Sequence, residues 1–295
     1  MAIVNLGSIN IDLVYRVPHI VAPGETLGAV SRQVFAGGKG ANQTVALARA
    51  GAKVYHAGRI GEDGRWILAK LADAGADTSL VEFDDGPTGH AVIQVSDDGE
   101  NSIIIDGGAN RRLDAAQIER TLSRFGPGDT LVLQNEVSGV AEAITRASAR
   151  GMRVCLTPAP MDEAATRLPL EQVAVLLVNR SEGRALAGLD DAERAVGQLQ
   201  RRTGGLVVMT LGGDGAVASD GSDTVRVPAY GVNPVDTTAA GDTFAGYFLA
   251  SLSTGAAPAA AMTLAARAAA ICVTRPGAMD SIPTREEVAK ARLPV

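Results

Sequence analysis

The sequence predicts an α/β protein with a doubly wound, mostly parallel sheet and a small second sheet beside it. From Leu113 onwards, short apolar runs alternate with helical patterns, which is typical of the strand–helix units of a parallel sheet. Three of these apolar runs are followed directly by polar residues, at 134–136, 157–160 and 179–182. Before Leu113, runs with a two-residue period indicate half-exposed strands that form a separate sheet.

The first half of the chain is predicted to hold two core strands, at 2–6 and 54–60. The small sheet would take its strands from an alternating run at 9–15, an extended segment at 26–35 and a hairpin whose turn is 96–100. In the alternating run, Asn10 and Asp12 share one face. Such side chains suit a polyol, whose hydroxyls both donate and accept hydrogen bonds, but the pattern alone is more typical of a strand face in water. We also expect Trp66 to pack in the core, on the apolar side of a helix that ends near Leu71.

The second half is predicted to alternate helices and strands and to end in alanine-rich helices. The expected helices include 113–125 and 138–150, and the expected strands are 130–133, 153–156, 173–178 and 206–210, followed by a hairpin around Gly221. Ligands of such sheets bind beyond the carboxyl ends of the strands. The polar residues that follow three of these strands should therefore share one rim and face a ligand.

The composition restricts the classes of partner. The 295 residues carry a formal charge of −6 and are 46% hydrophobic, enough for a substantial core and without a basic face, so nucleic acid is disfavoured. Cys155 and Cys272 lie far apart, which indicates reduced thiols rather than disulfides or a zinc site. The N-terminal residues do not form a signal peptide, and the most apolar long run, 256–273, contains Arg267. We expect a soluble, cytoplasmic protein that does not bind membranes.

Two glycine-containing turns carry the chemistry. Residues 36–44 open a helix with three glycines that allow close approach of a ligand, without the spacing of a Walker loop. Residues 236–246 lead from a loop into an apolar helix, and the small residues 239–241 leave backbone N–H groups exposed to an anion. Asp242 stands at this helix start. From the residues alone, its carboxylate either caps the helix or handles the proton of a hydroxyl that attacks a phosphate.

Both turns resemble signatures of the ribokinase family of sugar kinases, the phosphofructokinase-B group. The matching stretches are Gly37-Gly38-Lys39-Gly40-Ala41-Asn42 and Asp236-Thr237-Thr238-Ala239-Ala240-Gly241-Asp242, and the resemblance runs from Asn5 to Pro283. It implies one ribokinase-like domain over 1–295, with a three-layer α/β body. A small β-sheet lid would be drawn from about 9–17, 26–36, 88–96 and 101–106. It also implies transfer of a phosphoryl group from ATP to the primary hydroxyl of a pentose, with D-ribose, giving ribose 5-phosphate, as the first expectation.

The resemblance also implies roles for single residues. The catalytic group would be Asp242, with the amides of Ala239, Ala240 and Gly241 as an anion hole. The sugar would meet Asn10, Asp12, Gly38, Lys39, Asn42, Glu136 and Asp242. ATP would meet Asn179, Glu182, Thr210, Gly212, Gly213, Asp214, Gly215 and Gly241, with Mg²⁺ organised indirectly by Glu182. A monovalent cation, K⁺, would be held by Asp236, Thr238, Cys272, Arg275, Gly277 and Ser281.

The sequence is compatible with several alternative interpretations of single residues and of the function. Glu182 could instead be a structural residue, because a carboxylate in the first turn of a helix is favoured by the helix dipole. Asp214 replaces a basic or small polar residue of many relatives, and Ala266 replaces a polar or aromatic one that some relatives place against adenine. An exposed apolar lid face favours a homodimer. Fructose, a keto-deoxy sugar acid or a nucleoside could be the acceptor, and a sensor without catalysis is the alternative from another class. A Rossmann dehydrogenase is disfavoured because G-x-G-x-x-G does not follow the first strand. His19, His56 and His90 share no spacing for a metal or catalytic site.

Overall fold

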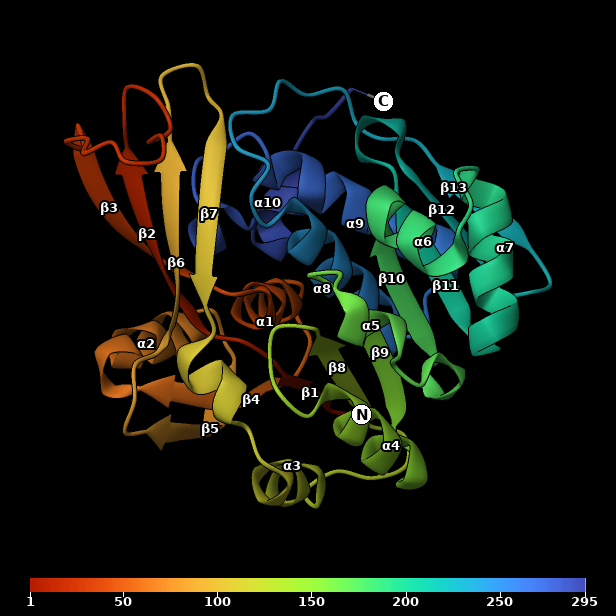
Figure 1. Ribbon diagram of the computed structural model, residues 1–295. Helices are drawn as coiled ribbons and strands as arrows, with labels where there is room; N and C mark the ends of the chain where they lie inside the picture. Colours follow the sequence, from red (N-terminus) through yellow and green to blue (C-terminus); the bar gives the residue numbers. More distant parts are fainter. Residues whose placement is uncertain (295) are drawn as a thin grey trace.

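The computed structural model describes residues 1–294, and within them it contains a nine-stranded and a four-stranded sheet (Figure 1). The larger sheet has the order β13-β12-β11-β10-β9-β8-β1-β4-β5. Its strands are β1 (Ile3–Leu6), β4 (Val54–Gly61), β5 (Asp77–Asp84), β8 (Thr130–Gln134), β9 (Arg153–Thr157), β10 (Val175–Asn179), β11 (Leu206–Thr210), β12 (Ala216–Ser219) and β13 (Thr224–Val227). All neighbours pair in parallel except β12 and β13, which form an antiparallel edge.

The strand order reverses direction at β1. The chain passes from β1 to β4 on one side and later fills the other side from β8 onwards. Such a switch point leaves a crevice outside the carboxyl ends of the strands, because the connecting segments diverge to opposite faces there. The fold therefore predicts where a ligand binds before any side chain is considered.

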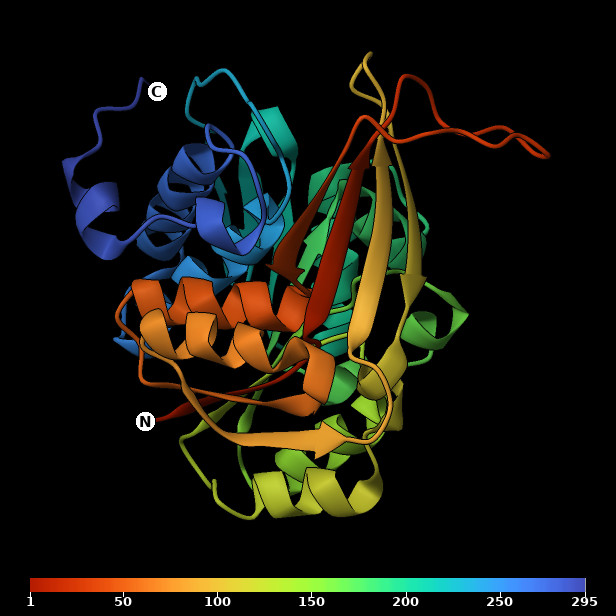
Figure 2. The ribbon, with the colours of Figure 1, turned by 90° about the vertical axis from the view of Figure 1, so that its left-hand side faces the viewer.

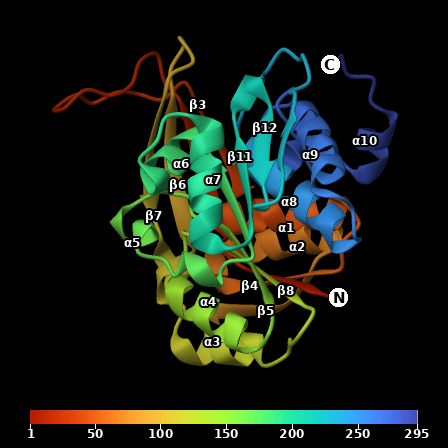
Figure 3. The ribbon, with the colours of Figure 1, turned by 90° about the vertical axis from the view of Figure 1, so that its right-hand side faces the viewer.

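Both faces of the large sheet are covered by helices, which makes three layers (Figure 3). Successive strand residues point to opposite faces, so Ile3 packs on one side and Val4 on the other. One face carries α1 (Lys39–Arg49), α2 (Arg65–Asp73), α8 (Ala240–Ser253), α9 (Pro258–Cys272) and α10 (Arg285–Lys290). The other carries α3 (Ala115–Leu122), α4 (Val140–Ala149), α5 (Glu163–Thr166), α6 (Arg180–Ala187) and α7 (Ala192–Thr203). Short 3₁₀ turns are η1 (Glu62–Gly64), η2 (Gly108–Arg112), η3 (Leu170–Gln172), η4 (Gly212–Asp214) and η5 (Met279–Ser281).

Helices α1 and α8 pack with their backbones almost in contact. A methyl group built on Gly246 of α8 would lie 2.3 Å from the Cβ of Ala46 and 2.8 Å from the backbone nitrogen of Leu47 on α1. Only glycine fits this crossing. Because the two helices approach so closely, the residues at the start of α8 reach side chains on the first turn of α1.

The small sheet stands over the carboxyl ends of the large one, and we call it the lid (Figures 1 and 2). Its strands are β2 (Asn10–Arg16), β3 (Ser31–Gly37), β6 (Gly89–Val95) and β7 (Asn101–Asp106), in the order β3-β2-β6-β7. The connection between β2 and β3 projects outwards from it (Figure 2).

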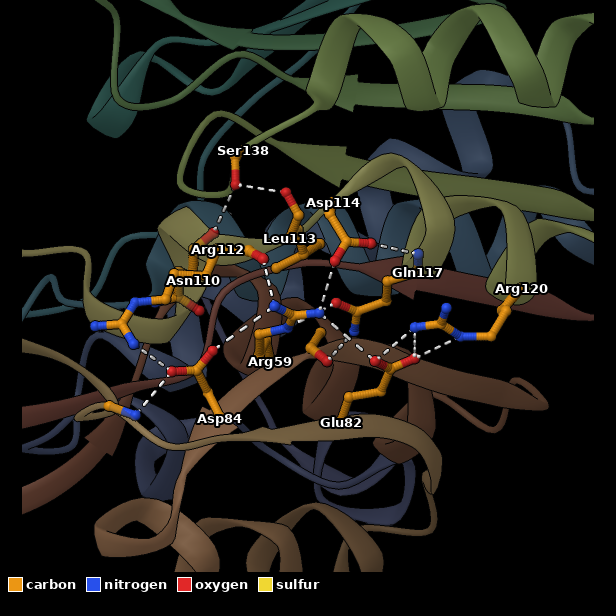
Figure 4. Close-up of polar contacts among 12 residues, drawn as sticks. Arg59, Glu82, Asp84, Asn110, Arg112, Leu113, Asp114, Gln117, Arg120 and Ser138 are labelled. Carbon is orange, nitrogen blue, oxygen red and sulfur yellow. Dashed lines mark hydrogen bonds and ion pairs between the residues drawn. The ribbon is translucent and has the colours of Figure 1, made fainter.

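The segment that returns from the lid to the body is clamped by a buried arginine (Figure 4). Arg59 of β4 donates to the carbonyl of Arg112 at 2.6 Å, to Gln117 Oε1 at 3.0 Å and to Asp114 Oδ2 at 3.3 Å. Its side chain is only 15% exposed and also pairs with Asp84. A largely desolvated guanidinium with several acceptors holds its partners in place. The end of η2 is therefore fixed to the body.

The predicted fold class is confirmed, with three local differences. Strand β3 begins at Ser31 instead of Thr26, and the edge strand β5 had no counterpart in the sequence prediction. The core position predicted for Trp66 is wrong, since this residue is 38% exposed. The buried face of α2 is formed by Ile67 and Leu71, four residues apart, which places Trp66 about 100° away from it. Among residues 1–294, no helix has the length and apolar character needed to cross a bilayer.

Candidate active site

A cavity of about 400 Å³ lies between the lid and the carboxyl ends of the large sheet. Every residue predicted to contact a sugar lines it: Asn10, Asp12, Gly38, Lys39, Asn42, Glu136 and Asp242. The lid adds an apolar wall of Ala91, Ile93, Ile103 and Ile105, and the strand ends add Thr157, Asn179 and Thr210. Polar groups from segments more than 200 residues apart thus converge on one space.

Asp242 is oriented by two amides of α1. Its Oδ2 accepts from Asn42 Nδ2 at 3.1 Å and its Oδ1 from Gln43 Nε2 at 3.0 Å, and the residue is 8% exposed. The N-cap of α8 is Ala239, and no side chain caps this helix. The capping interpretation of Asp242 is therefore wrong, and its carboxylate faces the cavity.

The loop before Asp242 has an unusual backbone. Ala239 has φ of 61°, the one positive value of a non-glycine residue in the described part of the chain, a conformation that costs about 1 kcal/mol or more. The N–H of Ala240 donates to the carbonyl of Thr237 at 3.2 Å. The amide of Ala240 is thus engaged within the loop, whereas Gly241 and Asp242 line the cavity itself.

Lys39 is the one cation among the described residues of the cavity wall, against four carboxylates. Asp242 is the main cause of a raised pKa of Lys39, burial opposes the rise, and Glu136, Glu182 and Asp12 add to it. Burial, reinforced by Glu136 and opposed by Lys39, raises the pKa of Asp12 to about 7. The cavity is therefore acidic, and a polyphosphate would need a bound cation to enter it.

Glu136 is held at the end of β8 by the glycine-rich turn. Its Oε2 accepts from Ser8 Oγ and from the backbone N–H of Lys39 at 2.9 Å. Gly38 has φ of 92°, and a Cβ there would lie 2.9 Å from the backbone nitrogen of Asn10. Glycine is required at this position for both reasons.

Asn110 is a site residue that the sequence prediction missed. It is 1% exposed, donates from Nδ2 to Asn10 Oδ1 at 2.7 Å and to the Ile9 carbonyl at 3.1 Å, and accepts from the Ile9 N–H at 3.0 Å. Its own carbonyl accepts from Ser138 (Figure 4). Because Asn10 Oδ1 is occupied, Asn10 presents its Nδ2 donor to the cavity. Asn10 is 5% exposed, so the solvent-facing interpretation of this residue is wrong. For Asn110, the sequence signal that could have indicated a site residue was its place directly after a lid strand, in Gly107-Gly108-Ala109-Asn110.

The residues predicted for a nucleotide divide into two groups. Asn179 and Glu182 form a capping box at the start of α6, with Glu182 accepting from the Asn179 N–H at 2.9 Å and from Nδ2 at 2.8 Å. The first-turn interpretation of Glu182 therefore holds, and the residue also lines the cavity, as Asn179 and Thr210 do. Gly212, Gly213, Asp214 and Gly215 do not line it; they form the turn after β11, where Asp214 pairs with Arg180 at 2.7 Å.

The two segments predicted to hold a monovalent cation meet behind the 236–242 loop. Asp236 accepts from the N–H of Thr238 and from that of Gly277, each at 2.9 Å. Cys272 Sγ lies 3.1 Å from Ser281 Oγ. The side chain of Arg275 pairs with Glu287, which leaves its carbonyl as the available ligand. In residues 1–294 no three His, Cys, Asp or Glu side chains cluster as a metal site, so any cation here would need backbone oxygens beside Asp236 and Ser281.

Asp12 should make the stability of the ligand-free protein fall as pH rises. Its pKa is about 7 in the folded state against 3.8 as a free side chain, so the folded state binds this proton more tightly between those values and loses stability over that interval. Asp12→Asn removes the effect. The melting temperature of the variant, relative to wild type, should therefore rise from pH 5 to pH 7 and level off above it. The exposed Asp97→Asn is the control; a difference independent of pH would contradict the assignment.

Comparison with known proteins shows which family this chain resembles. The family model described as pfkB family carbohydrate kinase matches residues 2–285. A ribokinase of Haemophilus influenzae is 37% identical over 292 residues, which is 96% of this chain and 95% of the relative.

Solved structures agree with this. A ribokinase of Thermotoga maritima has a TM-score of 0.89 at 35% identity, covering 98% of both chains. The ribokinase of Arabidopsis thaliana, solved with ribose and ATP, has a TM-score of 0.86 at 32% identity and covers 98% of this chain and 97% of its own. The match extends over nearly the whole chain, and the chain belongs to the pfkB family of carbohydrate kinases.

Proposed function

We propose that this protein transfers the γ-phosphoryl group of ATP to the primary hydroxyl of D-ribose, giving ribose 5-phosphate and ADP. The observation that carries the proposal is the position of Asp242. Its buried carboxylate stands at the start of α8 and faces the same cavity as Asn10, Asp12 and Lys39. The identities of about a third to ribokinases, one of them solved with ribose and ATP, support ribose as the acceptor.

The reaction follows from these groups. The sugar hydroxyl attacks the γ-phosphorus, the bond from that phosphorus to the bridging oxygen of ADP breaks, and Asp242 takes the hydroxyl proton. Charge on the transferred group is stabilised by backbone donors at the start of α8, for which the amides of Gly241 and Asp242 are the better candidates because that of Ala240 is engaged. Closure of the apolar lid wall over the bound sugar would exclude water as a competing acceptor.

The cavity offers a polyol both kinds of partner. Asn10 presents a donor, since its oxygen is occupied by Asn110. The acceptors are the carboxylates of Asp12, Glu136 and Asp242, which line the same cavity. A hydroxyl serves either group, and a ring with several hydroxyls serves both at once.

Two cations complete the proposal. Mg²⁺ would be organised through water by Glu182, whose buried carboxylate lines the acidic cavity, and it supplies the positive charge that lets ATP phosphates approach. K⁺ would be held by Asp236, by carbonyls of Thr238, Cys272, Arg275 and Gly277, and by Ser281. The hydrogen bond from Gly277 to Asp236 brings these segments together. The need for ATP and the two free cysteines favour a cytoplasmic location.

A coupled assay of ADP release tests the acceptor. We expect the highest kcat/KM with D-ribose in a panel that includes fructose, deoxyribose, a keto-deoxy sugar acid and nucleosides. Turnover should require Mg²⁺ and rise when K⁺ replaces a large organic cation. A higher kcat/KM for another acceptor would reassign the substrate within the family, and binding without ADP release would favour the sensor.

Asp242→Asn tests the catalytic base. The substitution keeps the size of the side chain but removes the proton acceptor, so kcat should fall about a hundredfold or more. Ribose binding by calorimetry and the melting temperature should change little. Turnover near that of wild type would remove Asp242 from this role.

The lid is also the proposed contact of a homodimer. Its outer face carries one apolar row across all four strands, formed by Val34, Leu13, Val92 and Ile104 in register. Ile104 is 66% exposed, which is unfavourable in water for a residue within an apolar row.

Ile104→Glu should convert the dimer into a monomer, as measured by size-exclusion chromatography with light scattering. Charge placed in an apolar contact is desolvated without a partner, which opposes association. Leu264→Glu on α9 is the matched control and should remain dimeric. A monomeric wild type would refute the dimer.

A further inference from the structure

A chain of buried amides runs from Asp242 into the centre of the large sheet. Gln43, which donates to Asp242 Oδ1, accepts through its Oε1 from Gln134 Nε2 at 2.7 Å. Gln134 Nε2 also donates to Asn5 Oδ1 at 3.1 Å. Asn5 Nδ2 then donates to the Gly40 carbonyl at 2.9 Å and to Thr44 Oγ1 at 3.0 Å. The chain joins α8, α1, β8 and β1.

The direction of every hydrogen bond in this chain is determined by its two ends. The carboxylate of Asp242 only accepts, so Gln43 must turn its NH₂ group towards it and its oxygen away. The Gly40 carbonyl also only accepts, so Asn5 must turn its NH₂ group there and its oxygen towards Gln134. Two oxygens therefore face Gln134, and its single NH₂ group supplies one hydrogen to each. Flipping any one amide would place two oxygens or two NH₂ groups together.

The far end of the chain is uncharged. Thr44 Oγ1 accepts from Asn5 and forms a hydrogen bond of 2.7 Å with His56 Nδ1. Burial lowers the pKa of His56 to about 4, and an interaction with the backbone of Gly7 opposes this only in part. The ring is neutral at pH 7, and no ionic group other than Asp242 belongs to the chain.

The burial of the middle residues shows that their orientation has a cost. Gln43 and Gln134 are each 1% exposed, and neither lines the cavity. Gln134 Oε1 has no hydrogen-bond partner among the described residues, and the absence of a side chain on Gly7 makes room for it, since a Cβ there would lie 2.4 Å away. A buried acceptor without a partner is destabilising. The amide of Gln134 is kept although its oxygen is unpaired, because its NH₂ group serves the buried oxygens of both Gln43 and Asn5.

We propose that Gln43 and Gln134 are positioning residues: Gln134 holds the amide of Gln43 so that its NH₂ group points at Asp242 Oδ1 and keeps that carboxylate oriented towards the cavity. Asn42 serves Oδ2 directly, so the two oxygens are held by consecutive residues of α1. The remaining lone pairs of Asp242 face the cavity. The inference rests on the proposed function, in which Asp242 is the base, and adds the means by which it is kept ready to accept a proton.

The proposal is tested by the pH dependence of kcat, which reports the ionisation of the base in the substrate complex. Gln43→Met removes one donor to the carboxylate. Loss of a hydrogen bond to a charged group makes the charged form less favourable by an amount equivalent to roughly one to two pH units. The acid limb of the profile should therefore move to a higher pH by about one unit or more. Above that limb kcat should recover to within a few-fold of wild type, and the KM for ATP should not change.

Gln134→Glu is the second variant and acts one residue further away. Its carboxylate can only accept, so it turns the NH₂ group of Gln43 towards itself and the oxygen of Gln43 towards Asp242. The acid limb should move in the same direction. Lys39, Glu182 and Cys272 also interact electrostatically with Asp242, but they are present in wild type and in Gln43→Met alike, so the shift between these two proteins reports the amide alone.

Thr44→Val is the matched control, because it lies beyond the anchor of Asn5 on Gly40 and leaves the amides from Asn5 to Asp242 oriented. It should lower the melting temperature without moving the acid limb.

A uniform loss of kcat at all pH values in Gln43→Met, with the limb in place, would overturn the proposal. If Gln134→Glu does not fold, Gln43→Met alone decides. If Asp242→Asn keeps its turnover, the proposed function fails. If Asp242→Asn loses turnover while the acid limbs of Gln43→Met and Gln134→Glu stay in place, only the positioning inference fails.

Discussion

The close contact between α1 and α8 is the constraint on which the site depends. Gly246 allows the helix backbones to approach until the first turn of α8 meets the first turn of α1. Asp242 then lies within hydrogen-bonding distance of Asn42 and Gln43, which are 200 and 199 residues away in sequence. The group proposed as the base and the residues proposed to bind the sugar are therefore positioned by one helix crossing. A larger residue at 246 would separate them even if every polar side chain were kept.

The lid is attached to this centre by polar contacts at its base. Asn110 joins the segment after β7 to the backbone of Ile9 and to Asn10, where β2 begins. Arg59 then ties the end of the same segment to the body. The donor that Asn10 offers to the cavity is thus connected, through Asn110 and η2, to an arginine on β4. The lid contributes to recognition through this attachment as well as through its apolar wall.

Much of the architecture and most of the cavity could be predicted from the sequence, because both depend on local patterns. The parallel strands are apolar runs ended by polar residues, and the two helix starts carry their own glycines and small residues. Strand β5 was missed because it is an edge strand with polar residues on a half-exposed face. Trp66 was misplaced because one residue changes the direction of a helical side chain by about 100°. The contacts of Asn110, Gln43 and Gln134 span about 90 to 200 residues, so local patterns could not predict which residues they would meet.

The acidic wall of the cavity also bears on how the reaction ends. In the proposed reaction a sugar enters as a neutral molecule, and Asp12, Glu136 and Asp242 would accept its hydroxyls without opposing charge. In the proposed reaction the same molecule acquires a phosphate with a charge of about −1.5 to −2. The dianion then lies among carboxylates with Lys39 as the one compensating side chain of the described cavity wall. Repulsion that was absent on entry would favour departure, so the wall proposed to recognise the substrate would also help to expel the product.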